Sequence, residues 1–152
     1  MNQEKKPLSS LNKTRILAVV LLIFSPLSYL EVAHILDSGN TTYKDPGIMM
    51  PLFLIIAVLS PFVWRLIERE AIRQENKGKR GFKSPDDAWL KLFIIRATLN
   101  QAIFVYGLMI FFFSLYDTQK MLYFYPIGVV WAFFTWPTRK RYENFISQFE
   151  KQ

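Results

Sequence analysis

The chain has 152 residues and a formal net charge of +7; hydrophobic residues make up 51% of it and charged residues only 20%. Long stretches carry almost no charge while the charges gather between them, which excludes a water-soluble globule, a disordered tail and a fibrous repeat. The absence of cysteine excludes disulfides and thiolate metal sites, and the single histidine excludes a multi-histidine metal site.

The first predicted element is an apolar helix over residues 16–36, ILAVVLLIFSPLSYLEVAHIL, which follows a basic N-terminal segment. About 20 residues at ~1.5 Å each cross a hydrocarbon core of ~30 Å, so this segment is long enough to span a membrane. Its apolar region is longer than the ~7–15 residues of a secretory signal, and no small-x-small cleavage site follows. We therefore expect an uncleaved membrane anchor.

A second span is expected over residues 48–67, IMMPLFLIIAVLSPFVWRLI. It shares a Ser-Pro dipeptide with the first span, at Ser25-Pro26 and Ser60-Pro61. Proline inside a helix leaves a carbonyl without its N–H partner and usually kinks the axis, and a neighbouring serine can satisfy that carbonyl. Two such kinks either open a mid-membrane cavity or only shape the packing of the helices.

The connection over residues 68–91 is basic and continues the second helix with good helix formers. Gly78 and Gly81 are expected to end this extension. Ser84 then suits the N-cap of the next helix and Pro85 its first position, ahead of two acidic residues that face the positive end of the helix dipole. We interpret the connection as a solvated, partly helical loop; a docking surface for a cytosolic partner is the alternative.

Two further spans are predicted over residues 92–115 and 121–136. The last one, MLYFYPIGVVWAFFTW, is short, and its aromatic ends suit the membrane interfaces. A soluble protein with all these apolar helices would need a polar coat that the chain does not contain. The expected fold class is therefore all-α: a polytopic membrane protein with four transmembrane helices, forming one domain over residues 1–152 in contact with the lipid bilayer.

The basic residues predict which side of the membrane each connection faces. They gather before the first span, between residues 65 and 91, and after the last span, whereas the other two connections hold one each, Lys44 and Lys120. The positive-inside rule then places both termini and the long middle loop in the cytoplasm, as expected in a bacterial inner membrane. Acidic residues alternate with the basic ones in that loop, so no nucleic-acid partner is expected.

Polar side chains inside the spans are costly in lipid and are therefore candidates for function. Counted by helical rise, Ser25, Ser60, Asn100 and Gln101 lie near the midplane and Arg96 lies near the inner boundary. These residues form the candidate polar cluster or ligand-binding site. The long stem of Arg96 also allows its charge to reach the cytoplasmic headgroups.

One stripe of the third predicted helix carries Arg96, Asn100, Ile103, Gly107 and Ser114 at ~100° per residue. Small residues let helices approach and amides can bond across them, so we expect this stripe to face the bundle. Interhelical hydrogen bonding is the interpretation we favour for its polar members; a ligand or ion site is the alternative.

Glu31 and His34 form a second candidate pair, three residues apart on one face of the first span and near its outer end. Two such groups can share a proton and respond to pH. They are also close enough to the outer surface to reach water, and a satisfied interfacial pair is the interpretation we favour.

Two short stretches carry resemblances to known families. Residues Leu99–Phe113, LNQAIFVYGLMIFFF, resemble the ion-binding helix of rotary ATPase proteolipid subunits. The ion-carrying acid of that family falls on Gln101, whose amide cannot release a proton, and the first span lacks the family's glycines. The basic tail after Trp136-Pro137-Thr138 is similar to that of four-span bacterial inner-membrane proteins. Neither resemblance implies a reaction.

No sequence signature of an enzyme is present: there is no P-loop, dinucleotide glycine fingerprint, HExxH or nucleophile elbow. We expect no metal and no cofactor. The favoured interpretation is a non-catalytic structural, assembly or regulatory component that contacts other integral membrane subunits or self-associates. The alternative is a small transporter or a lipid- or quinone-binding protein that uses the mid-membrane polar cluster.

Overall fold

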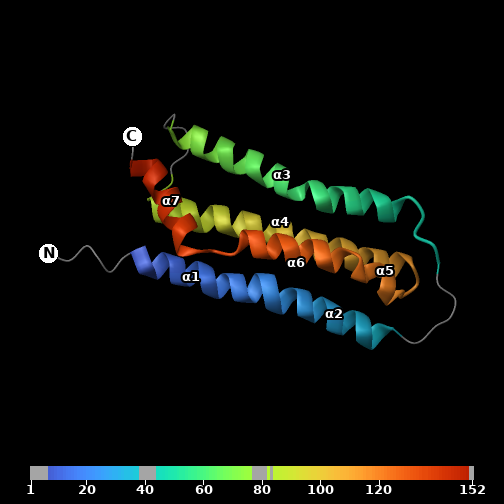
Figure 1. Cartoon of the computed structure of the whole chain (residues 1–152). Helices are drawn as coiled ribbons and strands as arrows, with labels where there is room; N and C mark the ends of the chain where they lie inside the picture. The colour runs from blue at the N-terminus through green and yellow to red at the C-terminus, as the bar shows by residue number, and fades with distance from the viewer. Residues whose placement is uncertain (1–6, 38–43, 77–81, 83, 151–152) are drawn as a thin grey trace.

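The computed structural model describes residues 7–37, 44–76, 82 and 84–150, and all regular secondary structure in these ranges is helical. The long helices lie side by side as antiparallel rods (Figure 1). One end of the bundle holds the beginning of α1 and all of α7, and we call it the terminal end; the other is the opposite end. The elements in chain order are α1 (Pro7–Val19), the π-helical turn η1 (Val20–Phe24), α2 (Ser25–Leu36), α3 (Met49–Asn76), α4 (Pro85–Phe113), α5 (Thr118–Leu122), α6 (Phe124–Thr135) and α7 (Arg139–Glu150).

Three helical segments are long and apolar enough to cross a membrane: Ser10–Leu36, Met49–Gln74 and Pro85–Phe113. They confirm that the first three predicted segments are long apolar helices, and each helix starts or ends several residues beyond the predicted bounds. Their outward surfaces carry many large apolar side chains, such as Ile35 and Leu66. Such surfaces suit lipid rather than water.

The fourth predicted span, residues 121–136, is not one helix. It is divided at Tyr123 into α5 and the 12-residue α6. Pro126 explains the division, because it has no N–H for the carbonyl of Leu122 and its ring would clash with that carbonyl. In the first turn of α6, where N–H groups have no intrahelical partner, the same proline is tolerated.

The centre of the bundle is α4, which contacts every other helical element. Glycines allow its close approach to α5 and α6. A Cβ atom at Gly128 would lie 2.3 Å from the ring of Phe104, and one at Gly107 would lie 3.1 Å from Cβ of Phe124. The predicted polar stripe of this helix does face the bundle, since its members from Asn100 to Ser114 are buried.

The predicted start of α4 is confirmed in detail. Ser84 has an extended backbone, its side-chain oxygen accepts a hydrogen bond from the backbone N–H of Asp87 at 3.2 Å, and Pro85 is the first helical residue. The helical extension of the second span is also present and reaches Asn76. Gly78 and Gly81, predicted to end it, lie outside the described residues.

The two Ser-Pro dipeptides behave differently. The hydroxyl of Ser60 donates to the carbonyl of Ala57 at 2.9 Å, which is the carbonyl that Pro61 cannot pair. A serine hydroxyl that bonds to the carbonyl left free by a proline is what we predicted for a membrane helix. At Ser25-Pro26 the chain instead forms η1, and the hydroxyl of Ser25 donates to Val20 at 3.3 Å.

The terminal end is closed by α7, a helix that we did not predict. Its Tyr142 and Phe145 are buried in a core with Leu11, Trp64 and Trp89, so residues from α1, α3, α4 and α7 meet there. The Tyr142 hydroxyl forms a hydrogen bond with the Asp86 carboxylate. Phe149 adds a further apolar residue at helical spacing after Tyr142 and Phe145, and this periodicity is the signal that reveals α7 in the sequence.

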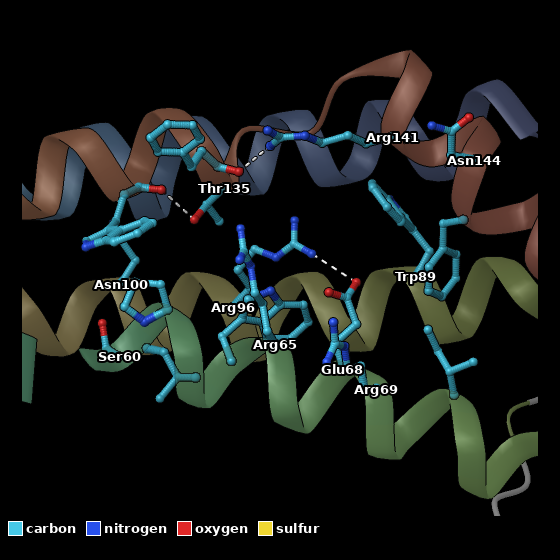
Figure 2. Close-up of a pocket in the computed structure, with 17 residues that line it drawn as sticks. Ser60, Arg65, Glu68, Arg69, Trp89, Arg96, Asn100, Thr135, Arg141 and Asn144 are labelled. Atoms are coloured by element: carbon cyan, nitrogen blue, oxygen red, sulfur yellow. Dashed lines mark hydrogen bonds and ion pairs between the residues drawn. The ribbon is translucent and has the colours of Figure 1, made fainter. Parts of the chain in front are cut away.

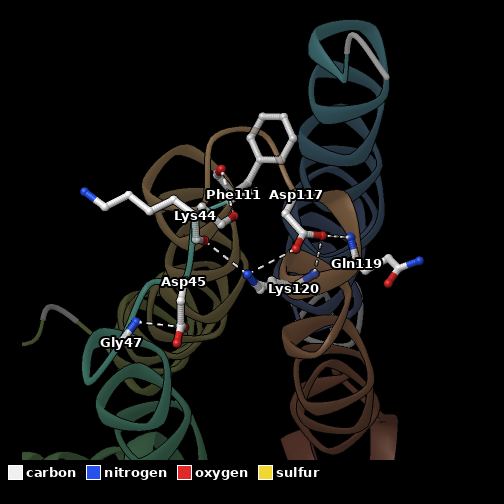
Figure 3. A network of polar contacts seen from close by, with 8 residues as sticks. Lys44, Asp45, Gly47, Phe111, Asp117, Gln119 and Lys120 are labelled. Atoms are coloured by element: carbon white, nitrogen blue, oxygen red, sulfur yellow. Dashed lines mark hydrogen bonds and ion pairs between the residues drawn. The ribbon is translucent and has the colours of Figure 1, made fainter. Parts of the chain in front are cut away.

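Polar groups at the opposite end satisfy one another (Figure 3). The Lys120 ammonium lies 3.3 Å from the Asp117 carboxylate and donates to the carbonyl of Lys44 at 3.1 Å. Asp117 also caps α5 by accepting from the backbone N–H groups of Gln119 and Lys120. A second contact, from the Thr118 hydroxyl to Asp37 at 2.6 Å, joins α5 to the end of α2.

The turn that leaves α4 is closed by a Schellman motif. The N–H of Tyr116 bonds to the carbonyl of Phe111 at 2.8 Å, and the N–H of Leu115 bonds to that of Phe112 at 3.3 Å. Leu115 and Tyr116 have φ of 58° and 71°, a left-handed conformation that normally favours glycine. This backbone is therefore strained.

Candidate functional site

A cavity of about 580 Å³ lies between α3, α4, α6 and α7, toward the terminal end (Figure 2). We call it the basic cleft. Its walls combine aromatic rings, four arginines, one glutamate and a few uncharged polar groups, which gives the lining a formal charge of +3. The residues that line it include Ser60, Pro61, Trp64, Arg65, Glu68, Arg69, Trp89, Arg96, Asn100, Trp131, Phe134, Thr135, Arg141, Asn144 and Phe145.

Arg96 and Glu68 form an ion pair across the cleft, with 3.1 Å between Nη2 and Oε1 (Figure 2). The guanidinium carbon also lies 4.3 Å from the ring centroid of Trp64, at cation–π distance. Both charged side chains are largely buried, so each needs the other to offset its desolvation. Arg96 still has a buried Nε without a hydrogen-bond partner among the described residues.

The sequence placed Glu68 in a solvated extension and Arg96 in the candidate polar cluster, with the cytoplasmic headgroups as the alternative location of the Arg96 charge. The structure corrects this interpretation, because Glu68 is the partner of Arg96. The sequence contains a signal for this pairing: Glu68 and Arg96 lie equally far along the chain from Phe82, in the connection between the two helices. In two antiparallel helices such positions come to the same depth.

Asn100 lies one turn after Arg96 and also lines the cleft. Its side chain is only 3% exposed, yet neither its Oδ1 nor its Nδ2 has a hydrogen-bond partner among the described residues. A buried amide without partners costs free energy and calls for an explanation. Within the ranges that the structure describes, this residue therefore does not make the expected interhelical hydrogen bond.

The structure brings only part of the predicted polar cluster together. Ser60 lines the cleft beside Arg96 and Asn100, although its hydroxyl is used by Ala57. Ser25 and Gln101 do not line it. Gln101 also has a buried amide without a partner among the described residues, so it bonds to no neighbouring helix there.

The second predicted pair is not a pair in the structure. Glu31 and His34 are both exposed on α2, and no hydrogen bond or ion pair joins them within residues 7–37. Both lie on α2 as predicted, and both side chains are exposed at its surface. Neither residue lines the basic cleft.

Two parts of the cleft were missed by sequence reasoning. Arg65 and Arg69 were assigned to the solvated extension, but they line the cleft and form no hydrogen bond or ion pair in the part of the chain that the structure describes. Arg141 belongs to the unpredicted α7. Its guanidinium donates to the carbonyl of Phe134 and, at 3.2 Å, to that of Trp136, which closes the end of α6.

Within the described ranges, no three histidine, cysteine or acidic residues come close enough to hold a metal ion. Comparison of the chain with models of known protein families, with curated proteins and with solved structures found no match. The basic cleft combines fixed positive charge, aromatic walls and an amide that has no hydrogen-bond partner among the described residues.

Proposed function

We propose that the chain is an integral protein of a bacterial inner membrane that crosses the bilayer four times, with both termini in the cytoplasm. The three long apolar helices and the concentration of basic residues at the terminal end support this placement. The fourth crossing would be made by α5 and α6 together, which run beside α4 from the opposite end back toward the terminal end (Figure 1). The terminal end then lies at the cytoplasmic headgroups.

Within that membrane we propose a non-catalytic binding function: the basic cleft takes an amphiphilic ligand. The observation that carries this proposal is the Asn100 amide, which is buried in the cleft wall with both polar atoms unpaired among the described residues. A ligand that hydrogen-bonds Asn100 explains why a costly group lies there. This favours the lipid- or quinone-binding alternative over a purely structural polar stripe.

The test compares Asn100→Leu with Thr98→Leu in protein purified in mild detergent. Both changes replace a polar residue of α4 by leucine, but Thr98 is exposed and does not line the cleft. Native mass spectrometry should find a bound amphiphile on the wild type and on Thr98→Leu, and several-fold less on Asn100→Leu. Equal occupancy on all three proteins would sink the proposal.

A second candidate function, an assembly component that contacts another membrane protein, is favoured by the position of α3. Only 11% of the apolar stretch of α3 is buried inside the protein, against 39% of the apolar stretch of α4. An outer face this open is available to a second integral membrane subunit or a second copy of the chain. Co-purification of a stoichiometric protein partner that is lost on substituting exposed α3 residues such as Leu59 and Leu66 would support it.

A further inference from the structure

We propose that the ligand of the basic cleft is a membrane lipid whose phosphate headgroup carries at least two negative charges, such as a phosphomonoester or a pyrophosphate. This inference rests on the proposed binding function and specifies its ligand. It depends on three features of the cleft: the balance of charge, the groups left without partners, and the apolar surfaces beside its walls.

The balance of charge selects an anion. Four arginines line the cleft against a single carboxylate, Glu68, whose ion pair among the described residues is with Arg96. Arg141 donates its hydrogen bonds to main-chain carbonyls, which carry no formal charge, so the cleft keeps an excess of positive charge. A headgroup with one negative charge would leave most of this excess positive charge in place, whereas two or more charges neutralise most of it. Guanidinium groups match phosphate oxygens in pairs, which favours phosphate as the anion.

The unpartnered groups show where such a headgroup would bind. Arg65 and Arg69 lie one turn apart on α3 and form no hydrogen bond or ion pair among the described residues. Both line the same cavity as Arg96, whose Nε has no hydrogen-bond partner in the described part of the chain (Figure 2). Asn100 lies one turn further from the terminal end, ~6 Å along α4. A phosphate among the arginines would therefore leave the Asn100 amide facing the ester region of the same lipid.

The surfaces beside the cleft indicate a lipid rather than a soluble phosphate. Trp64 and Trp131 line it, and tryptophan is typical of the depth at which headgroup and acyl chain meet. Next to the lining residues Pro61 and Trp131, the helices expose Phe62 and Val130. An acyl chain leaving the cleft would lie on these faces, whereas a free phosphate would make no contact with them.

The experiment measures lipid binding to the purified full chain by native mass spectrometry, with lipids of identical acyl chains. The probes are phosphatidylcholine, phosphatidylglycerol, phosphatidic acid and free inorganic pyrophosphate. We expect phosphatidic acid to bind about tenfold or more tightly than phosphatidylglycerol, phosphatidylcholine to bind weakest, and free pyrophosphate to compete poorly. Equal affinity for phosphatidic acid and phosphatidylcholine would overturn the inference, and so would full competition by free pyrophosphate.

Two arginine variants of α3 provide the matched comparison. The double variant Arg65→Gln/Arg69→Gln removes two exposed charges of the cleft, while Arg73→Gln removes an exposed arginine of the same helix that pairs with Glu70 outside it. The double variant should lose the preference for phosphatidic acid at unchanged thermal stability, and Arg73→Gln should keep it. An equal loss in both would contradict a site in the cleft.

The results also separate this inference from the proposed function. Lipid binding that depends on Asn100 but not on headgroup charge would overturn this inference alone. No lipid binding at all would overturn the proposed function too.

Discussion

The two ends of the bundle use polar residues in opposite ways. At the opposite end, Asp117, Lys120 and Thr118 find partners in the protein itself, and the network joins α5 to the chain segments that follow α2. In the basic cleft, by contrast, the Asn100 amide and the Nε of Arg96 have no hydrogen-bond partner among the described residues. A polar group that is satisfied internally stabilises the fold, whereas a buried polar group without a partner costs free energy; for Asn100 we propose that a ligand supplies the partner.

The largest expected effect comes from breaking the one satisfied ion pair of the cleft. Arg96→Leu leaves the largely buried Glu68 carboxylate without its partner, and we expect a loss of about 2–4 kcal/mol in the free energy of unfolding. The double variant Arg96→Leu/Glu68→Leu should recover most of this loss, because it removes the unpaired charge as well. Thermal unfolding in detergent checks the prediction; a double variant no more stable than the single one would argue against a direct pair.

A smaller loss is expected at the opposite end. Asp117→Ala removes both the N-cap of α5 and the partner of Lys120, and should cost about 1–2 kcal/mol of unfolding free energy. Because Asp117 does not line the basic cleft, ligand occupancy measured by native mass spectrometry should not change at temperatures where the variant is folded. A variant that kept its stability but lost its ligand would reverse our assignment of the two ends.

Relieving the strained turn beside that network should stabilise the protein. Leu115 has a φ of 58° and an exposed side chain, so Leu115→Gly removes a steric penalty without removing a core contact. We expect a gain of about 1 kcal/mol, seen as a higher midpoint of thermal unfolding. Phe113→Gly, an exposed position two residues earlier in the last turn of α4, is the control and should destabilise.

The smallest effect concerns pH at the terminal end. Burial raises the pKa of the Tyr142 hydroxyl above its usual value of about 10, and the hydrogen bond to Asp86 raises it further. The folded protein thus holds the proton more tightly than the unfolded chain, so this stabilisation is complete below about pH 10 and is lost as the pH rises through the folded-state pKa. Unfolding midpoints of the wild type should therefore fall more steeply above pH 10 than those of Tyr142→Phe; parallel curves would contradict the assignment.

Local patterns predicted much of this architecture. The long apolar runs, the Ser84 cap and the inward stripe from Asn100 to Ser114 depend on neighbours along one helix, and all three are present. The division of the fourth segment depends on one residue, Pro126. The apolar run around this proline led us to predict a single helix there.

The cleft was harder to predict because it depends on contacts between distant segments. Glu68 and Arg96 are 28 residues apart, and Arg141 reaches the site only because α7 folds back over the terminal end. The basic residues of α3 and α7 were interpreted as a topology signal, and those of α3 also as part of a solvated extension, so their convergence on one cavity was not predicted. Gln101 and Ser25 showed the converse error: similar depth did not bring them into the same cavity as Asn100.

The most direct test of the ligand-binding account maps where a lipid binds. A phosphatidic acid analogue with a photoreactive group beside its headgroup is cross-linked to the wild-type chain in a bilayer, and the adducts are located by peptide mass spectrometry. We predict adducts on the cleft segments around Arg65–Arg69 and Trp131–Asn144. Adducts spread evenly over the outward faces of the bundle, including the exposed residues of α2, would contradict the account.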